Sequence, residues 1–231
     1  MLLYQPQSGY RYNSDSLFLY DFINQFNPKG ELLDVGAGCG IVGLLVARDN
    51  PKVKLDSVEK QEFFLKYLSK NIITNKIDCN IINNDFRELP NDKKYDFIVS
   101  NPPFYPDGTK QSENEVLQNA RYSSNLPLSD FFKKVSILLK PHSHFVFCYD
   151  ASVFGDICSA LEDVKMRAVD VRFVHPKLDR KASIVMIHAR NGSKSMMNVM
   201  APLISVEDGQ PSTEVNNIYK KAQTESTQCQ I

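Results

Sequence analysis

Short runs of Val, Ile, Leu and Phe alternate with longer stretches of helical period from residue 31 onward. Short β-branched runs favour strands, and apolar positions that recur every three or four residues favour helices. This pattern predicts strands at residues 31–35, 53–58, 80–83, 96–100, 144–149, 168–174 and 184–189. It predicts helices at residues 41–48, 62–75, 128–139 and 153–162, with a further helix over residues 13–26 ahead of the first strand.

The alternation of strands and helices predicts an α/β fold, a Rossmann-like seven-stranded, mostly parallel sheet with helices on both faces. Only residues 175–183 separate the last two strands, too few for a crossover helix, so these strands should form an antiparallel hairpin. We expect one domain over residues 1–191 and a C-terminal extension over 192–231 that packs on it. The extension carries a compact apolar piece at 196–204, and its polar end is expected to fray beyond Tyr219.

Composition narrows the class of protein. Of the 231 residues, 42% are hydrophobic, enough to fill a sizeable core. Lys plus Arg equals Asp plus Glu at 27 each, so any site for a polyanion must be a local patch. The five cysteines are scattered without a Cys-x-x-Cys pair, which argues against a disulfide framework and a structural metal site. Since no basic leader and no long apolar stretch is present, we expect a cytoplasmic protein that does not bind membranes.

The segment LLDVGAGCG, residues 32–40, leads from a predicted strand into a predicted helix. Its glycines, Gly36, Gly38 and Gly40, allow a tight turn and a close approach of the backbone to a ligand. Read one register later, residues 38–43 also match G-x-G-x-x-G, so the turn by itself leaves a dinucleotide site open.

Acidic residues stand at the ends of the first three predicted strands and favour one kind of ligand over another. Glu59 could accept the ribose hydroxyls of a nucleoside, and Asp85 an adenine amine, with Phe86 packed on the base. Asp34 disfavours a pyrophosphate but suits S-adenosylmethionine, which carries an ammonium and a sulfonium. Each acid alone could be an ordinary strand-end, helix-start or turn residue. At consecutive strand ends, where open α/β sheets bind ligands, the set favours a site for this methyl donor.

The next strand ends in SNPPF, residues 100–104. The side-chain oxygen of Asn101 and the carbonyl of Pro102 can each accept one hydrogen of a planar amine and so stabilise the positive charge that develops on its nitrogen. Proline adds no competing N–H, and Pro103 fixes the direction of the preceding carbonyl. Phe104 offers a face on which a base can stack. A surface turn followed by a core phenylalanine is the alternative for this segment in isolation.

Together, the glycine turn and Asn-Pro-Pro-Phe resemble the class I S-adenosylmethionine-dependent methyltransferases that act on amino groups. Along nearly its whole length the chain is similar to the bacterial enzymes that methylate N6 of an adenine in the anticodon loop of valine tRNA. The additional matches are Gln5 with GYRYNSDSL at 9–17, NARY at 119–122, HPKLDRKA at 175–182, and a tail with TEV at 213–215 and Ile218-Tyr219.

The resemblance implies roles for individual residues. Gly36, Gly38 and Gly40 would line the donor, with Glu59 on its ribose and Asp85 on its adenine. Asn101 and the carbonyl of Pro102 would hold the target amine, while Tyr10, Arg11 and Asp15 would lie near the donor's methionine end. Phe104 replaces a tyrosine that is common in the motif, which removes a hydroxyl and keeps the stacking face.

Basic residues are candidates for RNA contacts. The loop between the last two strands carries Lys177, Arg180 and Lys181 against one acid, and Lys110 and Arg121 follow the SNPPF segment. They are expected to contact phosphates; the alternative is that they are solvated loop charges.

Other activities share part of this pattern. Glutamine methyltransferases of the release-factor type carry a substantial N-terminal helical domain, whereas 33 residues precede Asp34 here. Ribosomal RNA guanine methyltransferases usually have two tandem domains. A nicotinamide oxidoreductase needs no Asn-Pro-Pro-Phe, and a non-catalytic RNA-binding module needs no donor pocket. The resemblance therefore implies methyl transfer from S-adenosylmethionine to the N6 amine of a tRNA adenine, with methylation of a protein glutamine or of a ribosomal RNA amino group as the alternative.

Overall fold

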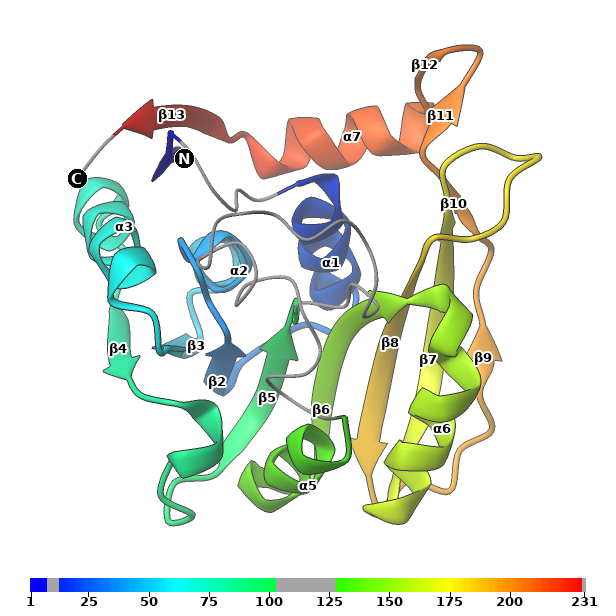
Figure 1. Cartoon of the computed structure of the whole chain (residues 1–231), viewed down its shortest axis with the longest axis horizontal. Helices are drawn as coiled ribbons and strands as arrows, with labels where there is room; N and C mark the ends of the chain where they lie inside the picture. Colours follow the sequence, from blue (N-terminus) through cyan, green and yellow to red (C-terminus); the bar gives the residue numbers. More distant parts are fainter. Residues whose placement is uncertain (8–12, 103–127, 230–231) are drawn as a thin grey trace, which may run out of the picture.

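A twisted central sheet organises the molecule (Figure 1). The structure is a computed structural model that describes residues 1–7, 13–102 and 128–229. All seven predicted strands are present, in the order β4-β3-β2-β5-β6-β8-β7. Their bounds are β2 (Gly30–Val35), β3 (Val53–Glu59), β4 (Cys79–Asn83), β5 (Tyr95–Ser100), β6 (Leu139–Asp150), β7 (Met166–His175) and β8 (Ile184–Asn191).

Two short strands extend the sheet beyond the predicted seven. Both β9 (Asn198–Val199) and β10 (Leu203–Ile204) pair with β7, which gives nine strands within the described residues. Strand β6 also begins at Leu139, earlier than predicted, because this residue already pairs with Tyr95 of β5.

Strand directions place the loops of interest at one edge. Strands β2 to β6 are parallel, and β8 is antiparallel to both β6 and β7, which confirms the predicted hairpin. Strand β7 therefore points the same way as β5. The glycine turn, Glu59, Asp85, Asn101 and the loop at residues 175–183 all follow carboxyl ends at this edge of the sheet.

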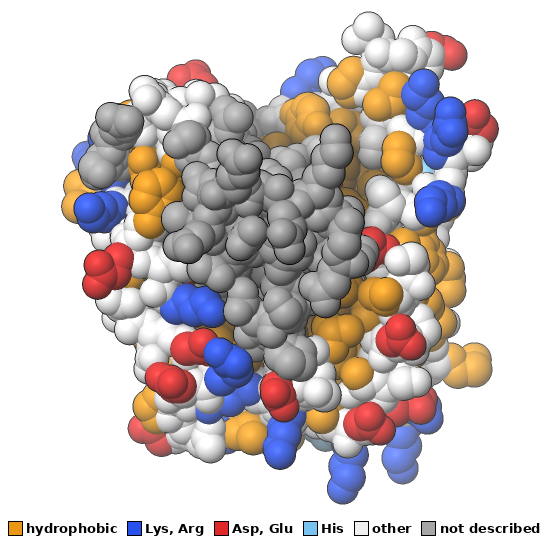
Figure 2. Space-filling model, viewed as in Figure 1, with side chains coloured by type: hydrophobic (Ala, Val, Ile, Leu, Met, Phe, Trp, Pro, Cys, Tyr) orange, Lys and Arg blue, Asp and Glu red, His pale blue; other side chains and the backbone are white. Residues whose placement is uncertain are grey.

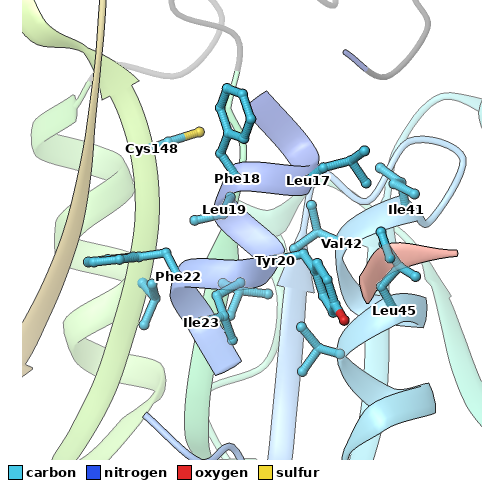
Figure 3. Packing of buried hydrophobic residues seen from close by; sticks show 14 of the residues in the cluster. Leu17, Phe18, Leu19, Tyr20, Phe22, Ile23, Ile41, Val42, Leu45 and Cys148 are labelled. Carbon is cyan, nitrogen blue, oxygen red and sulfur yellow. The ribbon is translucent and has the colours of Figure 1, made fainter. Parts of the chain in front are cut away.

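Helices cover both faces of the sheet (Figure 1). One face packs against α1 (Ser14–Asn24), α2 (Ile41–Asp49) and α3 (Glu62–Asn75), and the other against α5 (Leu128–Leu138) and α6 (Phe154–Asp163), which follows the 3-10 turn η3 (Ala151–Val153). Alternation along β5 explains this division, since Phe97 joins the first core and Ile98 the second. Figure 3 shows the first core, where Leu17 and Tyr20 of α1 face α2.

The C-terminal extension contains β11 (Val206–Glu207), β12 (Gln210–Pro211), α7 (Thr213–Ala222) and β13 (Glu225–Cys229). Helix α7 lies on α1, where the Tyr219 ring stacks on Phe18 at 6.5 Å between centroids. Residues 220–229, predicted as part of a frayed end, complete α7 and then form β13. The predicted apolar piece is only partly packed, since Leu203 is buried but Met196 is 92% exposed.

Strand β13 pairs in parallel with β1 (Leu2–Pro6), a strand that the hydrophobic pattern did not reveal. The outer edge of β1 is held by side chains of α3. Asn71 Oδ1 accepts from Tyr4 N at 2.7 Å, and Asn75 Nδ2 donates to Leu2 O at 2.7 Å. These carboxamides make hydrogen bonds to β1 of the kind that the backbone of a neighbouring strand would make.

Among the helices of the described residues, none has both the length and the apolar character that a membrane crossing requires.

Candidate active site

The glycine turn after β2 presents bare backbone. Gly36 and Gly38 have φ of 67° and 56°, which L side chains rarely adopt. Apart from the chain neighbours of each glycine, none of the described residues has a heavy atom within 4 Å of where a Cβ would stand at Gly36 or Gly38, so they leave room for a ligand at this part of the turn. Gly40 differs, because a Cβ there would lie 2.5 Å from Leu68 Cδ1. It permits close packing of α2 against α3.

Glu59 ends β3 and ties the glycine turn to that strand. Its carboxylate accepts hydrogen bonds from Gly38 N and Gln61 N, both at 2.9 Å. The side chain is buried, and burial raises the pKa of Glu59 above its usual value even though the backbone N–H groups oppose this. Glu59 thus shapes the turn, and a carboxylate with these backbone donors keeps lone pairs for further hydrogen bonds.

Asp34 lies on β2 and is 2% exposed. Its Oδ2 accepts from Gly43 N of α2 at 2.9 Å, and a Cβ at residue 43 would come within 2.6 Å of that oxygen. Burial, with a further contribution from the Glu59 charge, raises the pKa of Asp34 to about 7. The structure therefore places Asp34 inside the junction of β2 and α2, where it stabilises the start of the helix.

Asp85 and Phe86 are engaged within the protein. Asp85 caps the 3-10 turn η1 (Phe86–Glu88) and pairs with Arg87, whose Nη2 lies 2.7 Å from Asp85 Oδ2. Hydrogen bonds from Arg87 lower the pKa of Asp85 to about 2. Phe86 is buried against Phe131 of α5, with 5.4 Å between ring centroids. Its ring belongs to the core, which differs from the predicted stacking on a base.

Asn101 directly follows β5 and is held from two sides. Its Nδ2 donates to Ser16 Oγ of α1 at 3.0 Å, and its Oδ1 accepts from Cys148 Sγ of β6 at 3.0 Å. Because Val35 and Ser100 are paired neighbours in β2 and β5, the glycine turn and Asn101 begin side by side. Pro102 comes next and is buried.

Asp15 lies one residue before Ser16, in the first turn of α1. Asn13 caps this helix and donates from Nδ2 to Asp15 Oδ2 at 2.6 Å. Burial raises the pKa of Asp15. Its neighbour Ser16 contacts Asn101, so Asp15 belongs to the surroundings of that residue.

The loop between β7 and β8 reaches the same edge with three cations. A hollow of about 450 Å³ is lined by Lys177, Arg180 and Lys181 together with Pro176, Ala182 and Ser183. Leu178 at the tip is 81% exposed. Figure 2 shows Lys and Arg side chains gathered at this end of the molecule.

Six predicted site residues lie outside the described residues: Tyr10, Arg11, Pro103, Phe104, Lys110 and Arg121. Three other residues were missed. Ser16 and Cys148 contact Asn101, and Asn71 donates from Nδ2 to Cys39 O in the glycine turn at 2.8 Å. Cys148 lies near the end of residues 144–149, the strand predicted after 96–100 in the sequence. This position could have indicated it as a site residue. Within the described part of the chain, no three His, Cys, Asp or Glu side chains gather closely enough to hold a metal ion.

Residues 11–124 match the family described as the methyltransferase small domain. A tRNA1(Val) (adenine(37)-N6)-methyltransferase of Christiangramia forsetii is 26% identical over 146 residues, 61% of this chain and 60% of that protein. One of Flavobacterium johnsoniae is 29% identical over 188 residues, 78% of this chain and 79% of that protein. The chain thus spans about three fifths of the first relative and four fifths of the second. These matches confirm the resemblance that the motifs indicated.

Solved structures share the architecture. A predicted O-methyltransferase from Agrobacterium tumefaciens has a TM-score of 0.71 at 15% identity, covering 93% of this chain and 100% of that one. The 16S rRNA N2 G1207 methyltransferase of T. thermophilus, solved in complex with AdoMet and guanosine, has a TM-score of 0.59 at 21% identity, covering 80% of this chain and 45% of that one. Both confirm the predicted Rossmann-like α/β class.

Proposed function

We propose that this protein, which matches the methyltransferase small domain over residues 11–124, methylates the N6 amine of an adenine in a tRNA anticodon loop. S-adenosylmethionine is the donor. The observation that carries the proposal is the arrangement of Asn101 beside the glycine turn. Paired residues Val35 and Ser100 start both segments at adjacent strand ends, which lie ~4.8 Å apart. The names of the relatives support the tRNA substrate.

The residues present fit a nucleoside-type donor. Gly36 and Gly38 expose backbone without side chains in the way, and Glu59 stands at the end of the next strand with an acceptor for ribose hydroxyls. When bound, S-adenosylmethionine supplies an electrophilic methyl group. Asp85 already accepts hydrogen bonds from Arg87, so fewer of its lone pairs are left for an adenine amine. The glycine turn and Glu59 are therefore the principal donor-binding elements.

Asn101 orients and stabilises the amine that is methylated. Its Oδ1 and the carbonyl of Pro102 each accept one amine hydrogen, which turns the nitrogen lone pair out of conjugation with the ring. Positive charge develops on this nitrogen as it is methylated, so two preorganised acceptors stabilise the transition state more than the ground state. Proline suits the second position because it has no N–H to oppose that charge.

Lys177, Arg180 and Lys181 contact RNA phosphates in this proposal. Three strand spacings separate β7 from β5, roughly 14 Å at ~4.8 Å each. A nucleic acid backbone can span that distance while one base reaches Asn101. A chain with equal numbers of acidic and basic residues has no general attraction for RNA, so affinity has to come from such a local patch.

A ribosomal RNA guanine methyltransferase is the second candidate. A ribosomal RNA small subunit methyltransferase C of Mannheimia succiniciproducens is 28% identical over 99 residues, which are 42% of this chain and 29% of that protein. The two acceptors at Asn101 and Pro102 could hold the exocyclic amine of guanine equally well.

Incubation with labelled S-adenosylmethionine and unmodified total tRNA, followed by nucleoside analysis, tests the proposal. We expect label in N6-methyladenosine, and its loss with Asn101→Ala. The same reaction with unmodified 16S ribosomal RNA separates the two candidates. Label in N2-methylguanosine from ribosomal RNA, with none in tRNA, would replace the first function with the second.

A further inference from the structure

Two buried side chains from distant parts of the sequence converge on the Asn101 carboxamide. Ser16 is 85 residues away in the sequence and 1% exposed, and Cys148 is 47 residues away and fully buried. Ser16 Oγ accepts from Nδ2, while Cys148 Sγ donates to Oδ1, both at 3.0 Å. Each end of the carboxamide thus has a partner of its own.

The direction of that carboxamide matters for the proposed chemistry. An asparagine side chain can rotate by half a turn about its last bond, which exchanges the oxygen with the NH₂ group. Facing a substrate amine, the oxygen accepts a hydrogen, whereas the NH₂ group would place donor against donor. One rotamer therefore supports methylation and the other opposes it.

We propose that Ser16 and Cys148 are positioning residues that hold the Asn101 carboxamide with Oδ1 toward the amine being methylated. This inference rests on the proposed function. It assigns both residues a part in the reaction although neither touches substrate or donor.

The surroundings of Cys148 suit this role. Its side chain projects from β6 toward α1, close to Phe18 (Figure 3). Burial, with the Asp15 charge nearby, raises the pKa of the thiol, so Cys148 keeps the hydrogen that it donates. A thiol is a weak donor, and a carboxamide oxygen has two lone pairs. Oδ1 therefore retains the capacity to accept a hydrogen from the substrate.

Single-turnover methylation at saturating donor tests the assignment. Ser16→Ala and Cys148→Ala should each lower the rate roughly ten- to a hundredfold, because a misoriented acceptor stabilises the transition state less. Affinity for S-adenosylhomocysteine should not change. Cys148→Ser should restore most of the rate, since serine keeps a donor of similar size. Unchanged rates in both alanine variants would overturn the inference.

Cys79→Ala provides a matched control. Its thiol likewise lies near a polar side-chain oxygen, with Cys79 Sγ 3.3 Å from Ser57 Oγ, but the pair is in β4 and β3 and makes no bond to Asn101. This variant should keep the wild-type rate. A loss as large as that of Cys148→Ala would show that any removed thiol has the same effect, and the specific role would be wrong.

A double-mutant cycle separates positioning from general damage. Once Asn101→Ala has removed the carboxamide, adding Cys148→Ala should lower the rate no further. If the double variant instead lost rate by the product of the two single effects, Cys148 would act independently of Asn101. That result would contradict the inference.

An assay without RNA distinguishes failure of this inference from failure of the proposed function. The side-chain NH₂ signals of Asn101 in a ¹⁵N spectrum, identified by their absence in Asn101→Asp, should shift or broaden in Ser16→Ala and Cys148→Ala but not in Cys79→Ala. If these signals respond but Asn101→Ala leaves methylation unchanged, the proposed function is wrong and the positioning stands. If the signals do not respond, the positioning is wrong.

Discussion

Asp34→Asn is expected to flatten the pH dependence of folding stability. Burial raises the pKa of Asp34 from 3.8 to about 7 in the native state. A carboxyl whose folded pKa is raised binds more protons when folded than when unfolded. Its contribution to stability is complete below pH ~4 and is lost as the pH rises through ~7. Asp34 therefore lowers the stability of the wild-type protein between pH 5 and pH 8, whereas the lowered pKa values of His144 and His188 act in the opposite direction.

The magnitude follows from linkage. With pKa values of 3.8 and about 7, this single group removes about 2 to 3 kcal/mol from the free energy of unfolding between pH 5 and pH 8. Asparagine cannot ionise, and its Oδ1 can still accept from Gly43 N. The free energy of unfolding of Asp34→Asn minus that of the wild type should therefore increase by this amount from pH 5 to pH 8. In melting temperature this is a relative gain of roughly 5 to 10 °C for the variant at the higher pH.

Thermal and urea unfolding at pH 5, 6, 7 and 8, at one ionic strength, measure this difference. The other titrating groups are present in both proteins, so their contributions largely cancel in the difference; Glu59 is the exception, because its charge interacts with that of Asp34. Asp96→Asn is the control. Partial burial acts to raise the pKa of Asp96, but the hydrogen bond from Lys140 holds that pKa below its usual value. This carboxyl has therefore finished titrating by pH 5. Parallel stability curves for Asp34→Asn and wild type would refute the buried, protonated Asp34.

Three further predictions concern binding and turnover. Asn101→Ala should lower single-turnover methylation by on the order of a hundredfold while S-adenosylhomocysteine binds nearly as before; lost binding with an intact rate would make Asn101 a pocket residue. Glu59→Ala should weaken S-adenosylhomocysteine binding by ~2 to 3 kcal/mol in calorimetry, because the change removes a charged acceptor and the Gly38 bond together, and unchanged affinity would contradict this. Changing Lys177, Arg180 and Lys181 to Ala together should weaken tRNA binding. The slope of log affinity against log salt concentration should flatten by up to ~0.9 for each phosphate that is no longer neutralised, and donor affinity is the control. An unaltered slope would place the RNA elsewhere.

Local patterning predicted the sheet and the helices beside it because their hydrophobic periods are strong. Helix α3 spans residues 62–75 as predicted. Strand β1 carried no such signal. Its pairing depends on β13, more than 200 residues away, and on the carboxamides of Asn71 and Asn75. A rule that reads a window of ten to twenty residues cannot detect partners of this kind.

The candidate-site residues that stand at the ends of strands could be predicted from the sequence. Asn101 and the glycine turn lie as neighbours because their strands do. The sequence could not show that Arg87, two residues after Asp85, would occupy that carboxylate, because either side chain could equally face solvent. Phe86 was predicted to pack on a bound base because it follows Asp85 in the sequence. In the structure its ring is buried against Phe131 instead.

The pairing of β1 with β13 has a consequence for the timing of folding. Gln5 Nε2 donates to Ser226 Oγ across 221 residues of sequence. At synthesis rates of ~5 to 20 residues per second, roughly ten to forty-five seconds separate the two strands on the ribosome. During that interval one edge of β1 has no strand partner in the nascent chain, and contacts of such high order form slowly. Tyr4 of β1 and Cys229 of β13 pack in one cluster with Cys39 of the glycine turn, so the surroundings of this turn are completed by a segment made long after the turn itself.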